Sequence, residues 1–363
     1  MTYSQLFEPL QVGDLSLRNR ILMAPMTRSR ATDDDRVTAL QARYYQQRAS
    51  AGLIISEGVH PSIDGKGYNR TPGMYNADQV ADWTEVTEAV HEEGGLIACQ
   101  LMHCGRIGHS FNKAPGARFL APSAIAAKAE IFTPKGMQAM PIPEAMSIAD
   151  IDTVITQYGD AASRCLEAGF DAVELHCASG YLPAQFLATG SNAREDDYGG
   201  SLDNRLRFVE RVLDALVSAV GAGRVGLRIA PGNPYNDHHD DNPTETFSAL
   251  LQRASARHLA WVHAIRIPAS GIDNLALARQ HFSGVVIGNE SFDAAEANAA
   301  IGSGDVDAVA FGRYFIANPD LPARFAQNAD LNPLDKRSIY AGDGEPGYTD
   351  YPFLPDPEVS AKP

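Results

Sequence analysis

The chain has 363 residues, of which 44% are hydrophobic and 21% are charged, a composition typical of a globular protein with enough material for a large core. Its formal net charge of −15 argues against binding to nucleic acid or to an anionic membrane, because both need a basic surface. No apolar run is long enough to span a bilayer and the first residues lack the pattern of a signal peptide, so we expect neither a membrane anchor nor export.

Short apolar runs, rich in β-branched residues, alternate with amphipathic segments along the whole chain. Nearly continuous apolar character is typical of strands that are buried on both faces of a parallel sheet. Eight such runs, each followed by a helical segment, predict one (β/α)8 TIM barrel that spans residues 1–363. The runs are residues 20–26, 52–58, 95–103, 171–176, 224–231, 261–267, 284–289 and 307–313.

The segments between the runs have the period of amphipathic helices. Across 147–169 apolar residues recur at steps of one, three or four, and Ser147 with Asp150 forms a capping pair at the start. Residues 76–94 repeat this design, with Asn76 as the expected N-cap. Each segment therefore predicts a helix with one buried stripe.

Two regions depart from a minimal barrel. Residues 104–146 join the third strand to its helix and are rich in Pro, Gly and Ala. This excursion is too long for a simple loop, so we expect it to fold over the mouth of the barrel. Residues 330–363 form a proline-rich tail without helical period, which we expect to pack back onto the barrel.

Polar residues at the carboxyl ends of the strands are the candidate site, because catalytic groups lie there in this fold. The first strand ends in Pro25, Met26 and Thr27, and the second ends near Gly58; Gln100 and Met102 lie on the third, His176 ends the fourth, Arg228 lies on the fifth, and Gly312 with Arg313 ends the eighth.

Arg228 points inward by strand alternation, and a buried arginine is costly unless it is paired. No acidic partner lies on its own strand. Two interpretations stay open: a core ion pair with a neighbouring strand, or contact with an anionic or electron-rich ligand. Together with Gln100, Arg228 suggests a planar heterocycle that has both donors and acceptors.

Gly312 and Arg313 follow the eighth strand and precede a short helical segment. Backbone N–H groups and a guanidinium in this arrangement suit a phosphate, and phosphate sites after strands seven and eight recur among barrels. The alternative is an ordinary ion pair between Arg313 and a nearby carboxylate.

His176, Ser179 and Tyr181 follow the fourth strand within six positions. The step of three from His176 to Ser179 predicts a helical turn with both side chains on one side, where two donors can hold one carbonyl oxygen. Tyr181 is then a candidate proton donor. Each residue alone is more often structural, and only their grouping indicates a site.

Several long motifs, in the correct order, resemble the Old Yellow Enzyme family of flavin-dependent ene-reductases. The resemblance covers nearly the whole chain and includes ELHCASGYLPAQFL, which contains the cluster after the fourth strand. The motifs occupy residues 7–28, 44–58, 100–109, 174–187, 196–208, 307–321 and 347–354.

The resemblance implies FMN across the barrel mouth, with NADPH or NADH as reductant and a small activated alkene as substrate. It implies that hydride passes from the nicotinamide to the flavin and then to an alkene conjugated to a carbonyl or nitro group. The implied flavin contacts are Pro25, Met26 and the potential-tuning Thr27 hydroxyl at the ring, Gly58 through its backbone, Gln100 and Arg228 at the pyrimidine edge, and Gly312 and Arg313 at the phosphate.

The resemblance also assigns the substrate side. His176 would bind the activating oxygen, and Tyr181 would protonate the carbon next to it. Tyr68 and Tyr348 would form walls of the pocket. Oligomeric state stays open between monomer and homodimer.

Four residues, at three places in the chain, depart from the family pattern. Ser179 stands where the family has Asn or His, so we expect weaker polarisation of the substrate and room for bulkier molecules. Met102 replaces a common aromatic and softens the wall behind the substrate. Glu290 and Ser291 stand where glycine usually approaches the phosphate, so the Glu290 carboxylate is expected to turn away, leaving the two N–H groups and the Ser291 hydroxyl as ligands. The alternative function is a flavin-binding protein or NAD(P)H oxidase with impaired ene-reduction.

Two other barrel chemistries are disfavoured. A Schiff-base aldolase needs a lysine at a strand end, and all six lysines lie in loops or in the tail. A metal-dependent hydrolase would carry a His-x-His pair on an early strand, which the sequence lacks. The four cysteines form no CxxC pair and no zinc spacing, so we expect no metal, reduced thiols and a cytoplasmic location; they are Cys99, Cys104, Cys165 and Cys177.

Overall fold

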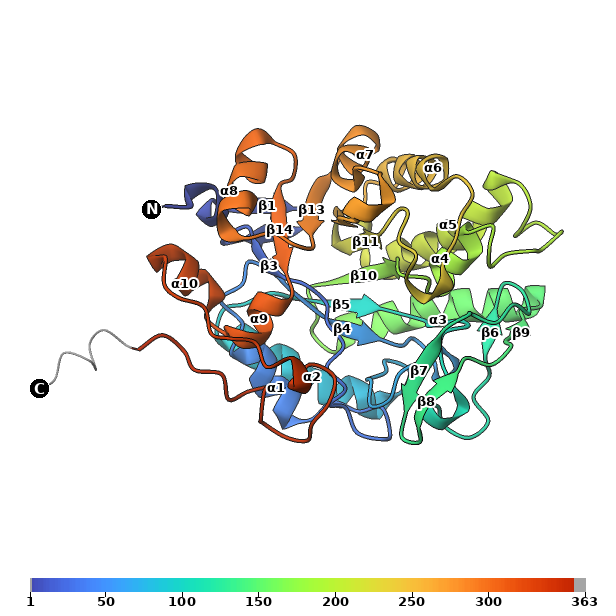
Figure 1. Cartoon of the computed structure of the whole chain (residues 1–363), viewed down its shortest axis with the longest axis horizontal. Helices are drawn as coiled ribbons and strands as arrows, with labels where there is room; N and C mark the ends of the chain where they lie inside the picture. Colours follow the sequence, from blue (N-terminus) through green and yellow to red (C-terminus); the bar gives the residue numbers. More distant parts are fainter. Residues whose placement is uncertain (1, 356–363) are drawn as a thin grey trace, which may run out of the picture.

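A computed structural model of the chain describes residues 2–355, and its centre is a closed barrel of eight parallel strands (Figure 1). Each predicted apolar run coincides with one barrel strand, so the predicted (β/α)8 barrel is confirmed. In chain order the strands are β3 (Ile21–Met23), β4 (Ile54–Val59), β5 (Ile97–Leu101), β10 (Ala172–Cys177), β11 (Val225–Ile229), β12 (Trp261–Ile265), β13 (Val285–Asn289) and β14 (Ala308–Phe311).

Helices surround the barrel, and the long helices bury one apolar stripe against it. The predicted caps are confirmed: Ser147 and Asp150 make a reciprocal capping box, and the Asn76 side chain accepts from the N–H of Gln79. The α-helices are α1 (Ala39–Gln46), α2 (Ala77–Glu92), α3 (Ile148–Glu167), α4 (Leu182–Leu187), α5 (Leu202–Val220), α6 (Pro243–Ala256), α7 (Asn274–His281), α8 (Ala294–Ser303), α9 (Arg313–Ala317) and α10 (Leu321–Gln327). Short 3-10 turns are η1 (Ser4–Phe7), η2 (Ile63–Gly65), η3 (Ser110–Asn112), η4 (Ala222–Arg224), η5 (Tyr235–Asp237), η6 (Pro268–Ser270) and η7 (Lys336–Ser338).

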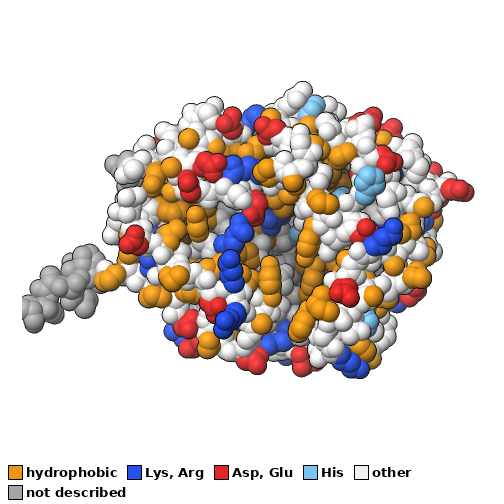
Figure 2. Space-filling view, in the orientation of Figure 1, with side chains coloured by type: hydrophobic (Ala, Val, Ile, Leu, Met, Phe, Trp, Pro, Cys, Tyr) orange, Lys and Arg blue, Asp and Glu red, His pale blue; other side chains and the backbone are white. Residues whose placement is uncertain are grey.

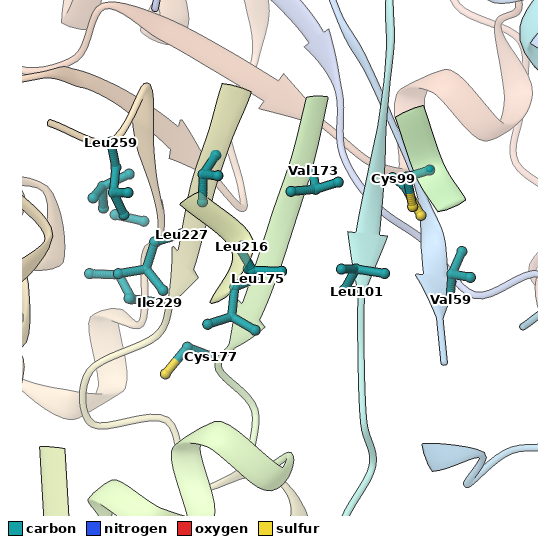
Figure 3. Packing of buried hydrophobic residues seen from close by; sticks show 14 of the residues in the cluster. Val59, Cys99, Leu101, Val173, Leu175, Cys177, Leu216, Leu227, Ile229 and Leu259 are labelled. Carbon is teal, nitrogen blue, oxygen red and sulfur yellow. The ribbon is translucent and has the colours of Figure 1, made fainter. Parts of the chain in front are cut away.

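The core has two layers because successive strand residues point to opposite faces. In β3, Leu22 packs inside the barrel, whereas Ile21 and Met23 pack outward against helices. Figure 3 shows the outward layer, in which Val173 and Leu175 of β10 lie beside side chains of the neighbouring strands. Burial on both faces explains the continuous apolar runs, since each large apolar side chain contributes about 1.5–3 kcal/mol when it leaves water.

A hairpin that the sequence analysis missed closes the amino-terminal end of the barrel. It consists of β1 (Leu10–Val12) and β2 (Leu15–Leu17), which pair antiparallel. Its turn residue Gly13 has φ +54, and a Cβ there would lie 2.1 Å from the carbonyl oxygen of Gly223, just before β11. Only glycine fits this position, and the opposite end of the barrel is left for the site.

The excursion at 104–146 contains two small sheets. The strands β6 (Leu120–Ala121) and β9 (Glu144–Ala145) pair in parallel, and β7 (Glu130–Thr133) and β8 (Gly136–Ala139) form an antiparallel hairpin. Residues of this hairpin line the cavity at the barrel mouth. The expected covering of the mouth is therefore confirmed.

The described part of the tail packs back onto the barrel beside α1, as expected (Figure 1). The Tyr348 ring stacks on that of Tyr44 with centroids 4.0 Å apart and planes 4° apart. Arg28 and Arg48 donate to tail carbonyls, among them that of Gly347 at 2.8 Å from Arg28 Nη2. Residues 356–363 of the predicted tail lie outside the described residues. Within the described chain, no helix has the length and apolar character needed to cross a membrane.

Candidate active site

Two adjoining cavities open at the carboxyl ends of the strands. The larger has a volume of about 770 Å3 and the smaller about 530 Å3. Figure 2 shows this molecule hollowed near the centre of the displayed face, with hydrophobic side chains along the hollow. Most sequence-predicted residues meet here: Pro25, Met26, Thr27, Gly58, Tyr68, Gln100, Met102, His176, Ser179, Tyr181 and Arg228 line the larger cavity, and Glu290, Ser291, Gly312 and Arg313 line the smaller one.

Arg228 lies between the cavities and lines both. Its Nη2 donates to Asn289 Oδ1 at 2.8 Å, and its Nη1 donates to the carbonyl oxygen of Pro25 at 3.4 Å. Its Nε has no hydrogen-bond partner in the described structure, although the residue is only 8% exposed. No carboxylate in residues 2–355 forms an ion pair with it, so the core ion pair is not made. A buried cation with an unused donor is costly unless a ligand completes it.

The Gln100 amide is held by the buried carboxylate of Glu174, a residue that the sequence analysis did not single out. Its Nε2 donates to Glu174 Oε1 at 2.8 Å, while Glu174 Oε2 accepts from Trp261 Nε1 at 2.9 Å and His263 Nδ1 at 3.0 Å. Burial opposes ionisation of Glu174, but His263, Arg228 and Trp261 together lower its pKa to about 2. The amide is thereby oriented with its oxygen available to accept, which complements the unused donor of Arg228. An acidic residue inside an apolar run was the available signal.

His176 is neutral and presents a donor to the larger cavity. Its Nδ1 accepts from the backbone N–H of Ala178 at 3.2 Å, so the proton of the neutral ring lies on Nε2. Burial, reinforced by the nearby charge of Arg228, lowers the pKa of His176 to about 3. A neutral imidazole N–H can hold a substrate oxygen without giving up its proton.

Ser179 lines the same cavity, but not on a helical turn. Its φ is +54, in the left-handed region, so the predicted helical turn from His176 to Ser179 is corrected. The turn is held instead by the Tyr181 N–H, which donates to the carbonyl of Ala178 at 3.2 Å, and by Asn236 Nδ2, which donates to the carbonyl of Ser179 at 2.8 Å. A two-residue reversal, with Gly180 also at positive φ, brings the side chains to one cavity.

Tyr181 and Tyr68 form a hydroxyl pair with their oxygens 2.9 Å apart. The Tyr181 ring also meets the His176 ring edge to face, with centroids 4.8 Å apart. Burial raises the pKa of both tyrosines above the ordinary value of 10.0. Tyr181 therefore keeps its proton and can donate it to a reacting atom beside His176.

The smaller cavity has a different character, because its charged groups are exposed. Arg313 Nη2 donates to Glu290 Oε1 at 2.5 Å, and the two side chains are 63% and 43% exposed. We expected the Glu290 carboxylate to turn away from the phosphate site, and this expectation is corrected. The carboxylate faces Arg313, which is the side chain that a phosphate would need as its partner. The alternative of an Arg313 ion pair is thus realised, although both residues line the cavity.

Tyr348 is the one predicted wall residue that lies elsewhere, and this expectation is corrected. It is fully buried behind the site, stacked on Tyr44, and it lines neither cavity. The cause is Arg28, whose guanidinium lies 5.0 Å from the Tyr348 ring centroid and donates to the neighbouring backbone. Tyr340, from the same tail, lines both cavities instead.

Several lining residues were missed because their segments carry no periodic signal. Phe132 and Met137 of the β7–β8 hairpin line the larger cavity while remaining 64% and 55% exposed. Exposed apolar side chains at a cavity rim are typical of a binding surface. Further missed residues are Ser29, Asn69, Arg70, Glu130, Ile131, Met140, Tyr235, Asn236, Ala341 and Gly342 in the larger cavity, and Asn289, the last residue of β13, in the smaller one.

The fold and the site together define a barrel oxidoreductase that binds a planar heterocycle with an anionic tail. The model of the NADH:flavin oxidoreductase / NADH oxidase family matches residues 5–332. The chain belongs to that family, the Old Yellow Enzyme family, and is an FMN-dependent oxidoreductase. The residues present fit FMN, because the unused donor of Arg228 and the oriented Gln100 suit the ring edge, and the smaller cavity adjoins them.

Relatives cover almost the entire chain. A "Probable flavin mononucleotide-dependent alkene reductase" of Leishmania infantum is 42% identical over 96% of this chain and 97% of its own length. The "12-oxophytodienoate reductase 7" of Oryza sativa subsp. japonica is 38% identical over 97% of this chain and 95% of its own. Among solved structures, morphinone reductase in complex with tetrahydroNAD is 44% identical with a TM-score of 0.92, covering 97% of this chain and 98% of that one. An Old Yellow Enzyme homologue from Zymomonas mobilis gives 36% identity and a TM-score of 0.92, covering 96% and 99%.

Proposed function

We propose that this enzyme uses NADPH or NADH to reduce the C=C bond of α,β-unsaturated carbonyl or nitro compounds. The observation that carries the proposal is the pairing of a neutral imidazole donor with a protonated tyrosine on one wall of a cavity lined by Arg228 and Gln100. The printed functions of the alkene reductase and morphinone reductase relatives support it.

FMN, when bound, supplies hydride chemistry between the nicotinamide and the alkene. We propose that Pro25, Met26, Thr27, Gly58, Gln100 and Arg228 hold its ring, with the Arg228 cation favouring negative charge on the reduced ring. We propose Gly312 and Arg313, with the backbone N–H groups of Glu290 and Ser291, as phosphate ligands. We propose that the enzyme acts as a monomer or as a homodimer.

On the substrate side, His176 Nε2–H donates to the activating oxygen, and Ser179 is the second, shorter donor. The Tyr181 hydroxyl then gives its proton to the carbon next to the carbonyl or nitro group, while Tyr68, hydrogen-bonded to it, orients that hydroxyl. Met102 and Tyr68 form the wall behind the substrate.

The alternative function, a flavin protein with impaired ene-reduction, is the weaker proposal because only one of the oxygen-binding pair is replaced. One experiment separates the two. The purified yellow protein is bleached by NADPH or NADH without oxygen, and 2-cyclohexenone is then added. Return of the flavin absorbance supports ene-reduction, whereas bleaching without return supports the alternative, and a protein that binds no FMN contradicts both.

We further propose a cytoplasmic enzyme that acts on small molecules and binds neither nucleic acid nor membranes. All four cysteines are buried and free of disulfides, which suits a reducing compartment. The net charge of −15 opposes binding to polyanions. We propose that residues 1–363 act as one FMN-binding unit.

A further inference from the structure

Glu290 and Ser291 adopt an unusual backbone in the wall of the smaller cavity. Their φ values are +76 and +58, so two consecutive residues with side chains lie in the left-handed region, which favours glycine. The carbonyl of Glu290 is fixed by Arg266 Nε at 2.9 Å, and the Arg266 guanidinium lies 3.5 Å from the centroid of the Phe292 ring. This contact holds the backbone from which the Glu290 side chain projects.

The Glu290 carboxylate projects toward the donors that would serve an anionic ligand. Its Oε1 accepts from Arg313 Nη2 at 2.5 Å and from the Ser291 hydroxyl at 3.2 Å. Other acids of this cavity lack that contact: Glu296 instead pairs with Arg266 at 3.4 Å. The carboxylate thus makes the contacts that a bound phosphate oxygen would make.

We infer that Glu290 is an intramolecular competitor for the FMN phosphate, which weakens retention of the cofactor by occupying Arg313 and Ser291. The inference rests on the proposed phosphate site. A phosphate and a carboxylate that share one guanidinium repel each other, so the Glu290–Arg313 contact opens when FMN binds. The cofactor is therefore held mainly through its ring, and its phosphate adds less affinity than the donors of the cavity would allow.

The expected change in FMN affinity depends on how exposed the Glu290 and Arg313 side chains are. An ion pair between side chains that are 63% and 43% exposed contributes little, and displacing it lowers affinity by about fivefold at most. Loss of the like-charge repulsion adds a similar, salt-dependent factor. We expect an overall change in FMN affinity of about five- to tenfold, smaller at high ionic strength.

The test titrates the FMN-free protein with FMN and, separately, with riboflavin, which lacks the phosphate, and follows the flavin fluorescence. Glu290→Gln keeps the size and shape of the side chain and one acceptor oxygen but removes its charge. We expect its Kd for FMN to fall by about five- to tenfold relative to wild type, with the Kd for riboflavin unchanged. Glu296→Gln is the matched control, an acid of the same cavity that pairs with Arg266 instead of Arg313, and it should change the FMN constant less than Glu290→Gln does.

Three results would overturn the inference: an unchanged FMN constant in Glu290→Gln, an equal gain for riboflavin, or an equal gain from Glu296→Gln. In each of these the FMN site itself survives. Failure of every variant to bind either flavin would instead overturn the proposed function, and the inference with it.

Discussion

The two cavities place their polar groups in opposite environments. In the larger cavity His176, Gln100 and Tyr181 are buried, and each is held by a second protein group: His176 by the Ala178 N–H, Gln100 by Glu174, and Tyr181 by Tyr68. In the smaller cavity the charged pair is largely exposed. Desolvation shifts pKa values and strengthens electrostatics, whereas exposure leaves contacts exchangeable. We therefore expect the buried groups to carry the proton chemistry and most of the cofactor affinity, whereas the exposed pair contributes less to retention of the cofactor.

The largest effect is expected from Tyr181→Phe, which removes the proposed proton donor from the larger cavity. Reoxidation of the reduced enzyme by 2-cyclohexenone should slow by about 10²–10⁴-fold, while flavin reduction by NADPH should stay nearly unchanged, because only the alkene step needs the proton. Anaerobic stopped-flow absorbance measures both steps separately. Tyr68→Phe, which leaves the donor in place, should slow reoxidation much less.

Equal slowing of the two steps in Tyr181→Phe would contradict the role of the tyrosine and would indicate a displaced flavin. A Tyr68→Phe variant as slow as Tyr181→Phe would instead show that the hydroxyl pair works as a unit.

The next effect contrasts one arginine from each environment. Arg228→Gln removes a buried cation with an unused donor, so the Kd for FMN should rise by about ten- to hundredfold, as for loss of a hydrogen bond to a charged group. Arg313→Gln removes an exposed cation already paired with Glu290, and the same constant should rise by about fivefold or less. Fluorescence titration of FMN measures both, and a larger loss from Arg313→Gln would reverse the comparison.

A smaller effect is expected from Ser179→Asn. The left-handed backbone at 179 accepts asparagine at least as readily as serine, so folding should be unaffected. The longer amide reaches further into the cavity, and we expect KM for a small cyclic enone to fall by about tenfold, with poorer turnover of bulky substrates. Steady-state kinetics on one compact and one bulky enone measures this, and unchanged constants for both would refute our account of Ser179.

The sequence allowed prediction of the barrel and of most lining residues, for definite reasons. Strands such as β10 are buried on both faces, so their apolar runs are unmistakable, and a barrel brings all carboxyl ends to one rim. Features that depend on contacts between distant parts of the chain could not be predicted. Tyr348 or Tyr340 could equally face the cavity until the position of Arg28 was known, and Arg28 lies more than 300 residues earlier in the chain.

The local backbone conformation at Ser179 and Glu290 could not be predicted from the sequence pattern either. A spacing of three between His176 and Ser179 fits a helical turn as well as a reversal through positive φ. The reversal is held in part by a long-range contact, in which the Asn236 amide donates to the Ser179 carbonyl. The backbone at Glu290 is likewise held by a long-range contact, because its carbonyl accepts from Arg266, which lies on a different loop.

The smallest effect is an absence of pH dependence, and it tests the buried character of the larger cavity. The pKa of His176 is about 3, against an ordinary 6.5, because of burial and of Arg228, partly opposed by Glu174. A lowered histidine pKa means that the folded protein keeps the ring neutral while the unfolded chain takes up a proton below 6.5. The stability from His176 is therefore complete above pH 6.5 and declines as the pH falls toward 3. The rate of reoxidation by 2-cyclohexenone should therefore stay constant between about pH 5 and 8. A change in this rate centred near pH 6.5, which disappears in His176→Asn, would contradict the prediction. It would show that the ring takes up a proton in the cavity and is not desolvated there.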